Sequence, residues 1–180
     1  MKWLALLVLM IAAGWYYFIG GRQLDEPMVR DFYLAGAHAT LSRDPEAQCK
    51  LIAKSAVLQI ETRIAGQTKS DSLNRAQACE QFRHAHEFFE QAGEKAGGML
   101  TIEYDYELGK IELAPDRKSA NVEFSSTLKM GEAFMQFRTM SNDRVVRNLG
   151  HVELAGAEAK TRVSFTPGAL ADPGKYFQSQ

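Results

Sequence analysis

Apolar and polar residues alternate along the chain from residue 100 to residue 154, and this pattern limits the fold more than any other feature of the sequence. A period of two places successive side chains on opposite faces of a β-strand. The phase changes at Gly109, as a β-bulge requires, and Asn142 with Asp143 is interpreted as a turn. We predict an antiparallel meander of four strands. These strands lie near residues 100–113, 120–130, 133–140 and 145–154.

The preceding part of the chain has helical patterns around one further strand. Asp25, with Pro27 two residues on, and Asp44, directly before Pro45, are typical helix starts. They predict a helix to about residue 41 and then a short one that includes Leu51 and Ile52. Residues 56–64 alternate as a strand does. Ser70 or Ser72 can cap a long helix whose apolar stripe ends near residue 92. The fold class is therefore predicted as α+β, with three helices packed on a curved antiparallel sheet.

The first 22 residues predict a transmembrane helix. No charged residue lies between Lys2 and Arg22, and about 19 helical residues would extend roughly 28 Å, close to the thickness of a bilayer's hydrocarbon layer. Aromatic residues suited to the two membrane interfaces stand near both ends of this segment. These are Trp3, Trp15, Tyr16 and Tyr17. A cleaved signal peptide ending near Ala12, Ala13 and Gly14 is the alternative. The basic residues on the two sides, Lys2 against Arg22 and Arg30, nearly balance, and the short leader before the apolar run, which resembles an export signal, favours the periplasmic side of a bacterial inner membrane for the domain.

Length and charge favour a single domain without nucleic acid as a partner. We expect residues 23–160 to form this domain. Residues 161–180 contain two Pro-Gly pairs and no periodicity, so we expect them to form a flexible tail. Basic residues are scattered among acidic ones, and the formal net charge is -1. The histidines show no chelating spacing, so no metal site and no cofactor are expected.

Cys49 and Cys79 are the two cysteines of the chain. In an oxidising compartment they could form a disulfide, which would close a loop of about 30 residues and stabilise the fold by roughly 3 to 4 kcal/mol. Two buried thiols are the alternative, because sequence spacing does not supply the distance between the two side chains.

Three segments resemble the nuclear-transport-factor-2-like superfamily of cone-shaped domains. Residues 32–47 and 52–60 are similar to its opening helices and first strand, and residues 137–147 are similar to its closing hairpin. The resemblance covers residues 28–155 and implies a sheet curled around a cavity. In steroid-isomerase-like members, a carboxylate base stands at the end of the first strand and a protonated acid on the third meander strand. The matching positions here hold Ile60 and Met135, which cannot transfer a proton, although Glu61 adjoins the first.

The resemblance also implies a candidate pocket lining, which an apolar or aromatic ligand would suit and which a filled core would suit equally. Its residues are Tyr104, Tyr106, Met135 and Phe137. Similar domains occur as membrane-anchored assembly parts of bacterial secretion machines. The leading hypothesis is therefore a membrane-anchored, non-enzymatic domain that binds a protein partner or forms a homodimer. The alternatives are an apolar small-ligand binding domain, or a steroid-isomerase-like or dehydratase-like enzyme with Glu61 or His151 as base.

Overall fold

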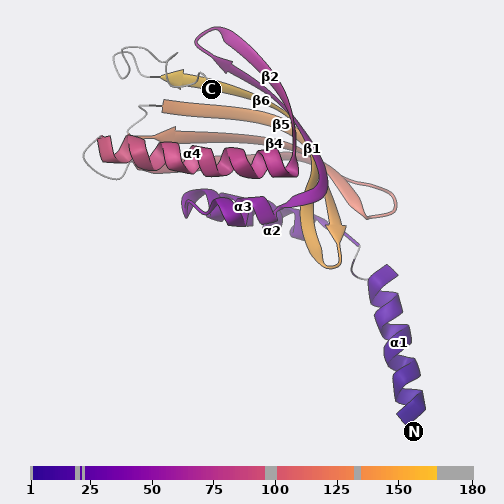
Figure 1. Cartoon of the computed structure of the whole chain (residues 1–180). Coiled ribbons are helices and arrows are strands. Elements are labelled where there is room, and N and C mark those ends of the chain that lie inside the picture. The colour runs from indigo at the N-terminus through magenta and orange to yellow at the C-terminus, as the bar shows by residue number, and fades with distance from the viewer. Residues whose placement is uncertain (1, 19–20, 22, 96–100, 132–134, 166–180) are drawn as a thin grey trace.

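A six-stranded sheet curls around three helices in the computed structural model, which describes residues 2–18, 21, 23–95, 101–131 and 135–165 (Figure 1). The helices are α1 (Lys2–Phe18), α2 (Glu26–Leu41), α3 (Pro45–Lys50) and α4 (Arg75–Lys95). The strands are β1 (Ile52–Ile64), β2 (Gln67–Asn74), β3 (Ile102–Leu113), β4 (Ser119–Met130), β5 (Met135–Asn148) and β6 (His151–Phe165). The predicted α+β class with a curved sheet is confirmed.

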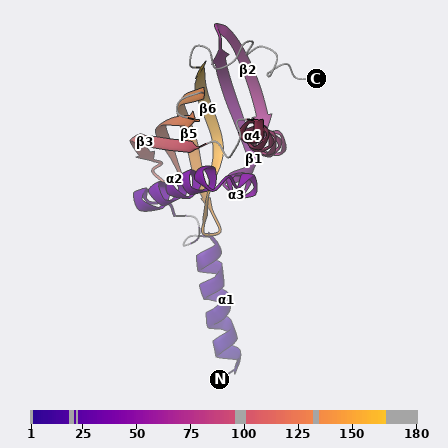
Figure 2. The ribbon, with the colours of Figure 1, turned by 90° about the vertical axis from the view of Figure 1, so that its left-hand side faces the viewer.

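The sheet has the strand order β2-β1-β6-β5-β4-β3, so its first and last strands in the sequence lie side by side. β1 pairs with β6 in parallel, and every other pair is antiparallel. The expectation of a purely antiparallel sheet was therefore wrong, because β1 has its own hairpin with β2 and reaches the meander only through β6. Helices α2, α3 and α4 all lie on the inner face of the curl (Figure 2).

Local signals predicted the starts of α2 and α3 correctly. The side chains of Asp25 and Asp44 accept hydrogen bonds from backbone N–H groups of the first turn, and a proline occupies the start of each helix. The register shift between Leu108 and Ile111 confirms the bulge expected at Gly109. The short helix ends at Lys50, however, and Ile52 already opens β1.

Strand β2 replaces the first part of the expected long helix. Neither Ser70 nor Ser72 caps α4. The cap is Asn74, whose Oδ1 accepts a hydrogen bond from the Gln77 N–H at 3.0 Å, while Gln77 Oε1 accepts one from the Asn74 N–H. β2 is a polar edge strand in which only Leu73 is buried, so it carries no apolar alternation.

The expected turn at Asn142 and Asp143 is also absent, because β5 runs unbroken through both residues. The chain reverses at Leu149 and Gly150, which both have positive φ. β6 then extends to Phe165, beyond the expected domain end at residue 160. Residues 166–180, where the flexible tail was expected, lie outside the described part of the chain.

Helix α1 projects away from the domain beside the turn between β5 and β6 (Figure 1). The backbone N–H of Gly150 donates a hydrogen bond to the Gly21 carbonyl at 2.8 Å. Gly150 has a φ of 89°, a backbone conformation that favours glycine, and a Cβ there would lie 2.9 Å from the Tyr16 hydroxyl oxygen. Over the residues described, no helix combines the length and apolarity needed to cross a membrane, and α1 has 17 residues. The expected span over residues 1–22 is therefore not found.

A buried polar pair links α2 to the sheet. The Tyr33 hydroxyl donates a hydrogen bond of 2.8 Å to Asp143 Oδ2, and both residues are 7% exposed. The Tyr33 ring stacks on Phe124 with 5.0 Å between centroids. Burial raises the pKa of the Asp143 carboxyl, while hydrogen bonds from Tyr33 and Ser141 act against this shift. Burial, followed by the neighbouring Asp143 charge, raises the pKa of Tyr33 far above its usual range.

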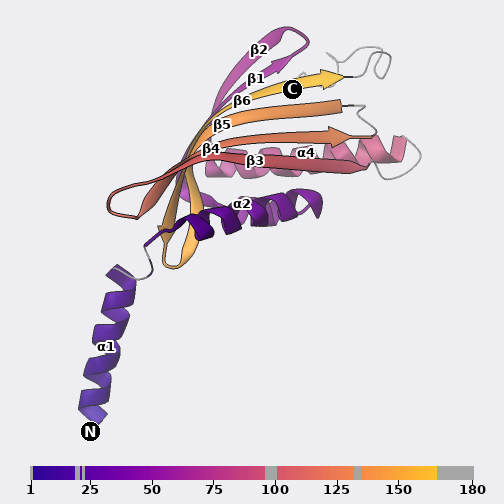
Figure 3. The same ribbon diagram turned by 180° about the vertical axis from the view of Figure 1, so that it is seen from behind.

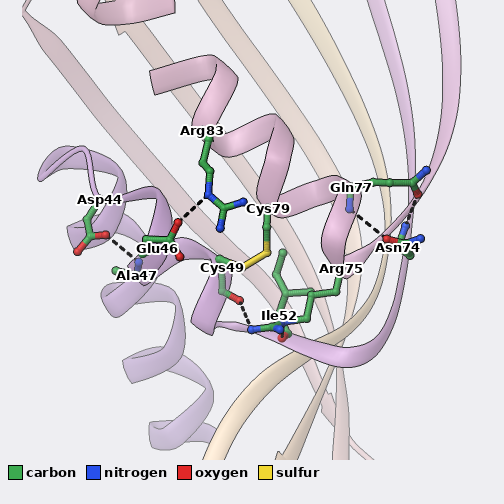
Figure 4. Close-up of a disulfide and its surroundings, with 10 residues drawn as sticks. All are labelled: Asp44, Glu46, Ala47, Cys49, Ile52, Asn74, Arg75, Gln77, Cys79 and Arg83. Carbon is green, nitrogen blue, oxygen red and sulfur yellow. Dashed lines mark hydrogen bonds and ion pairs between the residues drawn. A yellow bond between two sulfur atoms is a disulfide. The ribbon is translucent and has the colours of Figure 1, made fainter. Parts of the chain in front are cut away.

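A disulfide between Cys49 and Cys79 joins α3 to α4, with 5.1 Å between the two Cα atoms (Figure 4). Arg75 extends beneath it, and its guanidinium donates hydrogen bonds to the carbonyl oxygens of Ile52 and Cys49 at 2.9 and 3.3 Å. On the other side, Arg83 Nε lies 2.7 Å from Glu46 Oε1. The end of α3 is thus fixed to the first turns of α4.

Replacing both cysteines should destabilise the fold. The bond closes a loop of 30 residues, and its removal by Cys49→Ala with Cys79→Ala is expected to lower the free energy of unfolding by about 3 to 4 kcal/mol. Urea unfolding measures this difference. A reductant should lower the unfolding midpoint of the original chain and leave that of the double variant unchanged; an unchanged midpoint in both would contradict the role assigned to this bond.

The Tyr33 and Asp143 pair should make stability depend on pH. Because the pKa of Asp143 is higher in the folded chain, the folded state binds more protons between the unfolded value, about 3.9, and the raised value. The free energy of unfolding should therefore fall as pH rises through this interval. In Asp143→Asn, the amide oxygen can still accept a hydrogen bond from Tyr33, but this decrease in the free energy of unfolding with pH should disappear.

Urea unfolding across pH tests this expectation. Asp105→Asn is the matched control, since Asp105 is exposed on β3 and its substitution should leave the profile of the original chain. Identical profiles for Asp143→Asn and the original chain would contradict the assignment.

Candidate ligand-binding cavity

A cavity of about 290 Å³ lies between the helices and the inner face of strands β3 to β6. Helix α4 contributes residues at the spacing i, i+3, i+4 and i+7, so one helical face forms one wall. The opposite wall is the sheet, and the end of α2 together with α3 forms the rim. The lining consists of Thr40, Arg43, Pro45, Gln48, Phe82, Ala85, His86, Phe89, Ile102, Tyr104, Ser126, Leu128, Phe137, Thr139 and Thr161.

Hydroxyl groups form a row across the sheet wall of the cavity. Ser126 on β4 is the register partner of Thr139 on β5, which is in turn the partner of Thr161 on β6. The Oγ1 atoms of Thr139 and Thr161 are 3.0 Å apart and share one hydrogen bond. Each hydroxyl has one donor and two acceptor positions, so this row keeps hydrogen-bonding capacity toward the cavity.

Tyr104 on β3 lies diagonally from this row, because its register partner is Leu128, but its hydroxyl forms a hydrogen bond with Ser126. Burial raises the pKa of its hydroxyl, and a hydrogen bond with Ser126 acts against the shift, while Tyr106 and Asp143 nearby raise it further. Tyr104 is therefore a neutral hydroxyl at physiological pH, able to donate and accept a hydrogen bond.

The rim of the cavity is held by hydrogen bonds between α2 and α3. Thr40 Oγ1 donates to the Gly36 carbonyl at 3.0 Å and accepts from Gln48 Nε2 at 2.9 Å. Arg43 and His86 are the basic side chains on the described lining, and that lining includes no Asp or Glu. His86 Nδ1 lies 3.7 Å from Glu90 Oε1, which is too far for a hydrogen bond. The cavity wall therefore combines apolar surface with hydroxyl and basic groups.

The structure brings two of the four expected pocket residues to this cavity. Tyr104 and Phe137 line it. Tyr106 packs instead against the core beneath α2, with its ring 6.2 Å from that of Phe124, and Met135 is fully buried. The hydroxyl row was missed, because only strand register reveals which threonines and serines meet.

The positions matched to the steroid-isomerase-like acid and base lie outside this lining. Ile60 packs against the core cluster between β1 and α4, and Glu61 is exposed on the outer face of β1. An acid does occur on the third meander strand, at Asp143, but it is bonded to Tyr33 and does not line the cavity. The sequence pattern did not predict this buried acid, since Asn-Asp is a common turn pair. His151 is exposed beside the turn between β5 and β6.

No cluster of three or more His, Cys, Asp and Glu side chains suitable for a metal ion occurs within the described ranges. Basic, hydroxyl and amide groups are the polar functions that the described cavity lining offers to a bound molecule.

Solved structures with the same fold cover most of the domain, although the sequence matches no protein-family model and no curated protein. A conserved protein from Planctomyces limnophilus is 18% identical, with a TM-score of 0.55, and the match covers 79% of this chain and 98% of that one. A nuclear-transport-factor-2-like protein of unknown function from Silicibacter pomeroyi is 10% identical, with a TM-score of 0.50 and coverage of 76% and 94%.

A ketosteroid isomerase-like protein from Erwinia carotovora atroseptica is 12% identical, with a TM-score of 0.51 and coverage of 75% and 94%. At these identities the likeness concerns the fold and not the activity. The domain accordingly has the fold of the nuclear-transport-factor-2-like superfamily.

Proposed function

We propose that the cavity binds a small, mainly apolar molecule that carries at least one oxygen able to hydrogen-bond. The observation that carries this proposal is the hydroxyl row of Ser126, Thr139 and Thr161 on the sheet wall of a cavity that also has apolar and aromatic walls. Ligand sites combine these features, and a volume near 290 Å³ is at the lower end of their usual range of about 300 to 1,000 Å³. The ligand is therefore smaller than most drug molecules.

The basic and aromatic side chains of the lining restrict the type of ligand further. Arg43 and His86 favour a carboxylate, a phenolate or another acceptor group near the rim, because both can present N–H donors. The aromatic residues Phe82, Phe89 and Phe137 favour a planar or ring-shaped body. One solved structure with the same fold is named as a ketosteroid isomerase-like protein, and this name also supports a small molecule as the ligand of the cavity.

Binding without turnover is the better supported role. Steroid-isomerase-like proton transfer needs an acid and a base at the positions that hold Ile60 and Met135 here, and His86 and Tyr104 on the lining stand at other positions. Glu61 and His151 are not part of the described lining. A role in binding a protein partner or a second copy of the chain stays a prediction.

Helix α1 supports the further proposal that the domain is held at the periplasmic face of a membrane. Most of its described side chains are apolar and exposed around the whole helix, including Trp3, Trp15, Tyr16 and Tyr17. Such a helix is not stable in contact with water unless an apolar surrounding covers it. Its 17 residues extend about 26 Å, against roughly 30 Å for the hydrocarbon layer.

Filling the cavity should abolish binding of an aromatic probe. Thr139→Phe places a ring at the base of the cavity, and we expect it to weaken binding of anilinonaphthalene sulfonate at least about tenfold, measured by fluorescence titration. Met140→Phe is the matched control, because Met140 is the next residue on β5, points away from the cavity and is 71% exposed. Equal loss in both variants would show that the probe binds elsewhere.

A second variant guards against misfolding of the first. Phe137→Ala enlarges the cavity and should retain probe binding, while the unfolding midpoint of each variant reports its fold. Loss of binding in Thr139→Phe with an unfolding midpoint near that of the original chain would support the site, whereas unchanged binding in Thr139→Phe would contradict it.

Removal of residues 1–22 should release the chain from membranes. The full chain is expected in the membrane fraction after alkaline carbonate washing, because α1 is held by apolar contacts that high pH does not break. The shortened chain should appear in the supernatant. Recovery of a natural chain that begins at Trp15 in the supernatant would overturn the anchor and support a cleaved signal peptide, and protection of the domain from protease added to spheroplasts would overturn its periplasmic placement.

A further inference from the structure

Three arginines stand in one row on the outer face of the sheet. Arg63 on β1 is the register partner of Arg162 on β6, and Arg162 is the partner of Arg138 on β5. Their neighbours Thr139 and Thr161 face the cavity, so the arginine side chains point to the opposite face of the same strands. All three are exposed. We call Arg63, Arg138 and Arg162 the arginine row.

No carboxylate neutralises the arginine row within the described part of the chain. The residues that flank it across the strands are Thr127 on β4 and Thr68 on β2, and beyond Thr127 the exposed Asp105 on β3 lies two strands from Arg138. The described ion pairs involve other basic residues. Along the strands, Lys160 adds a further positive charge two residues from Arg162, and Glu61 offers one acidic group two residues from Arg63. Like charges directly opposite each other on adjacent strands are destabilising.

The spacing of the arginine row defines what could neutralise it. Adjacent strands lie about 4.8 Å apart, so the backbones that carry the three guanidinium groups span roughly 10 Å. A guanidinium group binds phosphate oxygens through two parallel hydrogen bonds. A single carboxylate would satisfy one arginine of the row, whereas several phosphate groups in series would satisfy all three.

We propose that the arginine row binds an oligophosphate, a small molecule with at least two closely spaced phosphate groups. This site is separate from the cavity, because it occupies the other face of β5 and β6, and it does not depend on the ligand proposed for the cavity. Seen from behind, β3 and β4 lie in front of α4, so α4 does not cover this side of the sheet (Figure 3).

The position of the arginine row favours a free oligophosphate over the headgroups of the membrane that would hold α1. Helix α1 meets the domain at the turn between β5 and β6, through Gly21 and Gly150. Arg138 lies ten residues before Asn148, the last residue of β5, which is about 33 Å along the strand. The row therefore stands toward the end of the sheet far from α1.

Calorimetric titration of the full chain in a nonionic detergent with tripolyphosphate at low salt tests the proposal. We expect binding at least about tenfold tighter than that of inorganic phosphate, and at least about tenfold weaker binding in Arg162→Gln. Arg144→Gln is the matched control, because Arg144 is exposed on the same outer face of β5 but is paired with Gly156 rather than with another arginine. It should bind within about twofold of the original chain.

Thermal unfolding supplies a second readout. Without tripolyphosphate, Arg162→Gln should unfold at a higher temperature than the original chain, because it removes the central like charge of the row. Tripolyphosphate should raise the unfolding temperature of the original chain and not that of the variant. Absence of tripolyphosphate binding to the original chain, equal affinity for inorganic phosphate, or equal losses in Arg162→Gln and Arg144→Gln would each overturn the proposal.

Discussion

The parallel pairing of β1 with β6 is the contact on which the arrangement of the domain depends. It joins the hairpin of β1 and β2 to the meander of β3 to β6 and so makes one sheet of two parts that are far apart in the sequence. The pairing brings α3 and α4, which pack on β1, to the same face of the sheet as α2, which packs on β3 and β6. The second core cluster, which includes Leu58, Ala78 and Leu154, lies where β1, β6 and α4 meet. Apolar burial there stabilises the curl that leaves room for the cavity.

Much of this fold could be predicted from the sequence because its signals are local. Asp25 and Asp44 cap helices through contacts within one turn, and the alternation of β3 and β4 depends only on neighbouring residues. The polar strand β2 could not be predicted in this way. It lies at the sheet edge, where one face offers little burial, and its serines resemble helix caps.

The sites depend on strand register, which sequence patterns do not supply. Tyr104 and Phe137 could be proposed for the cavity from the resemblance alone, but the row of Ser126, Thr139 and Thr161 required the pairing of three strands. Asp143 was interpreted as a turn residue because Asn-Asp is a common turn pair, and a buried carboxyl in mid-strand is rare without a partner. Its partner, Tyr33, lies 110 residues away in the sequence. Distant partners of this kind decide whether a polar residue belongs to a loop or to a core.

The disulfide between Cys49 and Cys79 also has a consequence for how the protein is produced. It connects α3, which supplies Pro45 and Gln48 to the rim, with α4, which supplies one wall of the cavity. The reducing cytosol of an ordinary expression host keeps such thiols apart. Chains made there would have a rim and a wall joined only by packing and hydrogen bonds, so the width of the cavity entrance would depend on the compartment in which the chain folds.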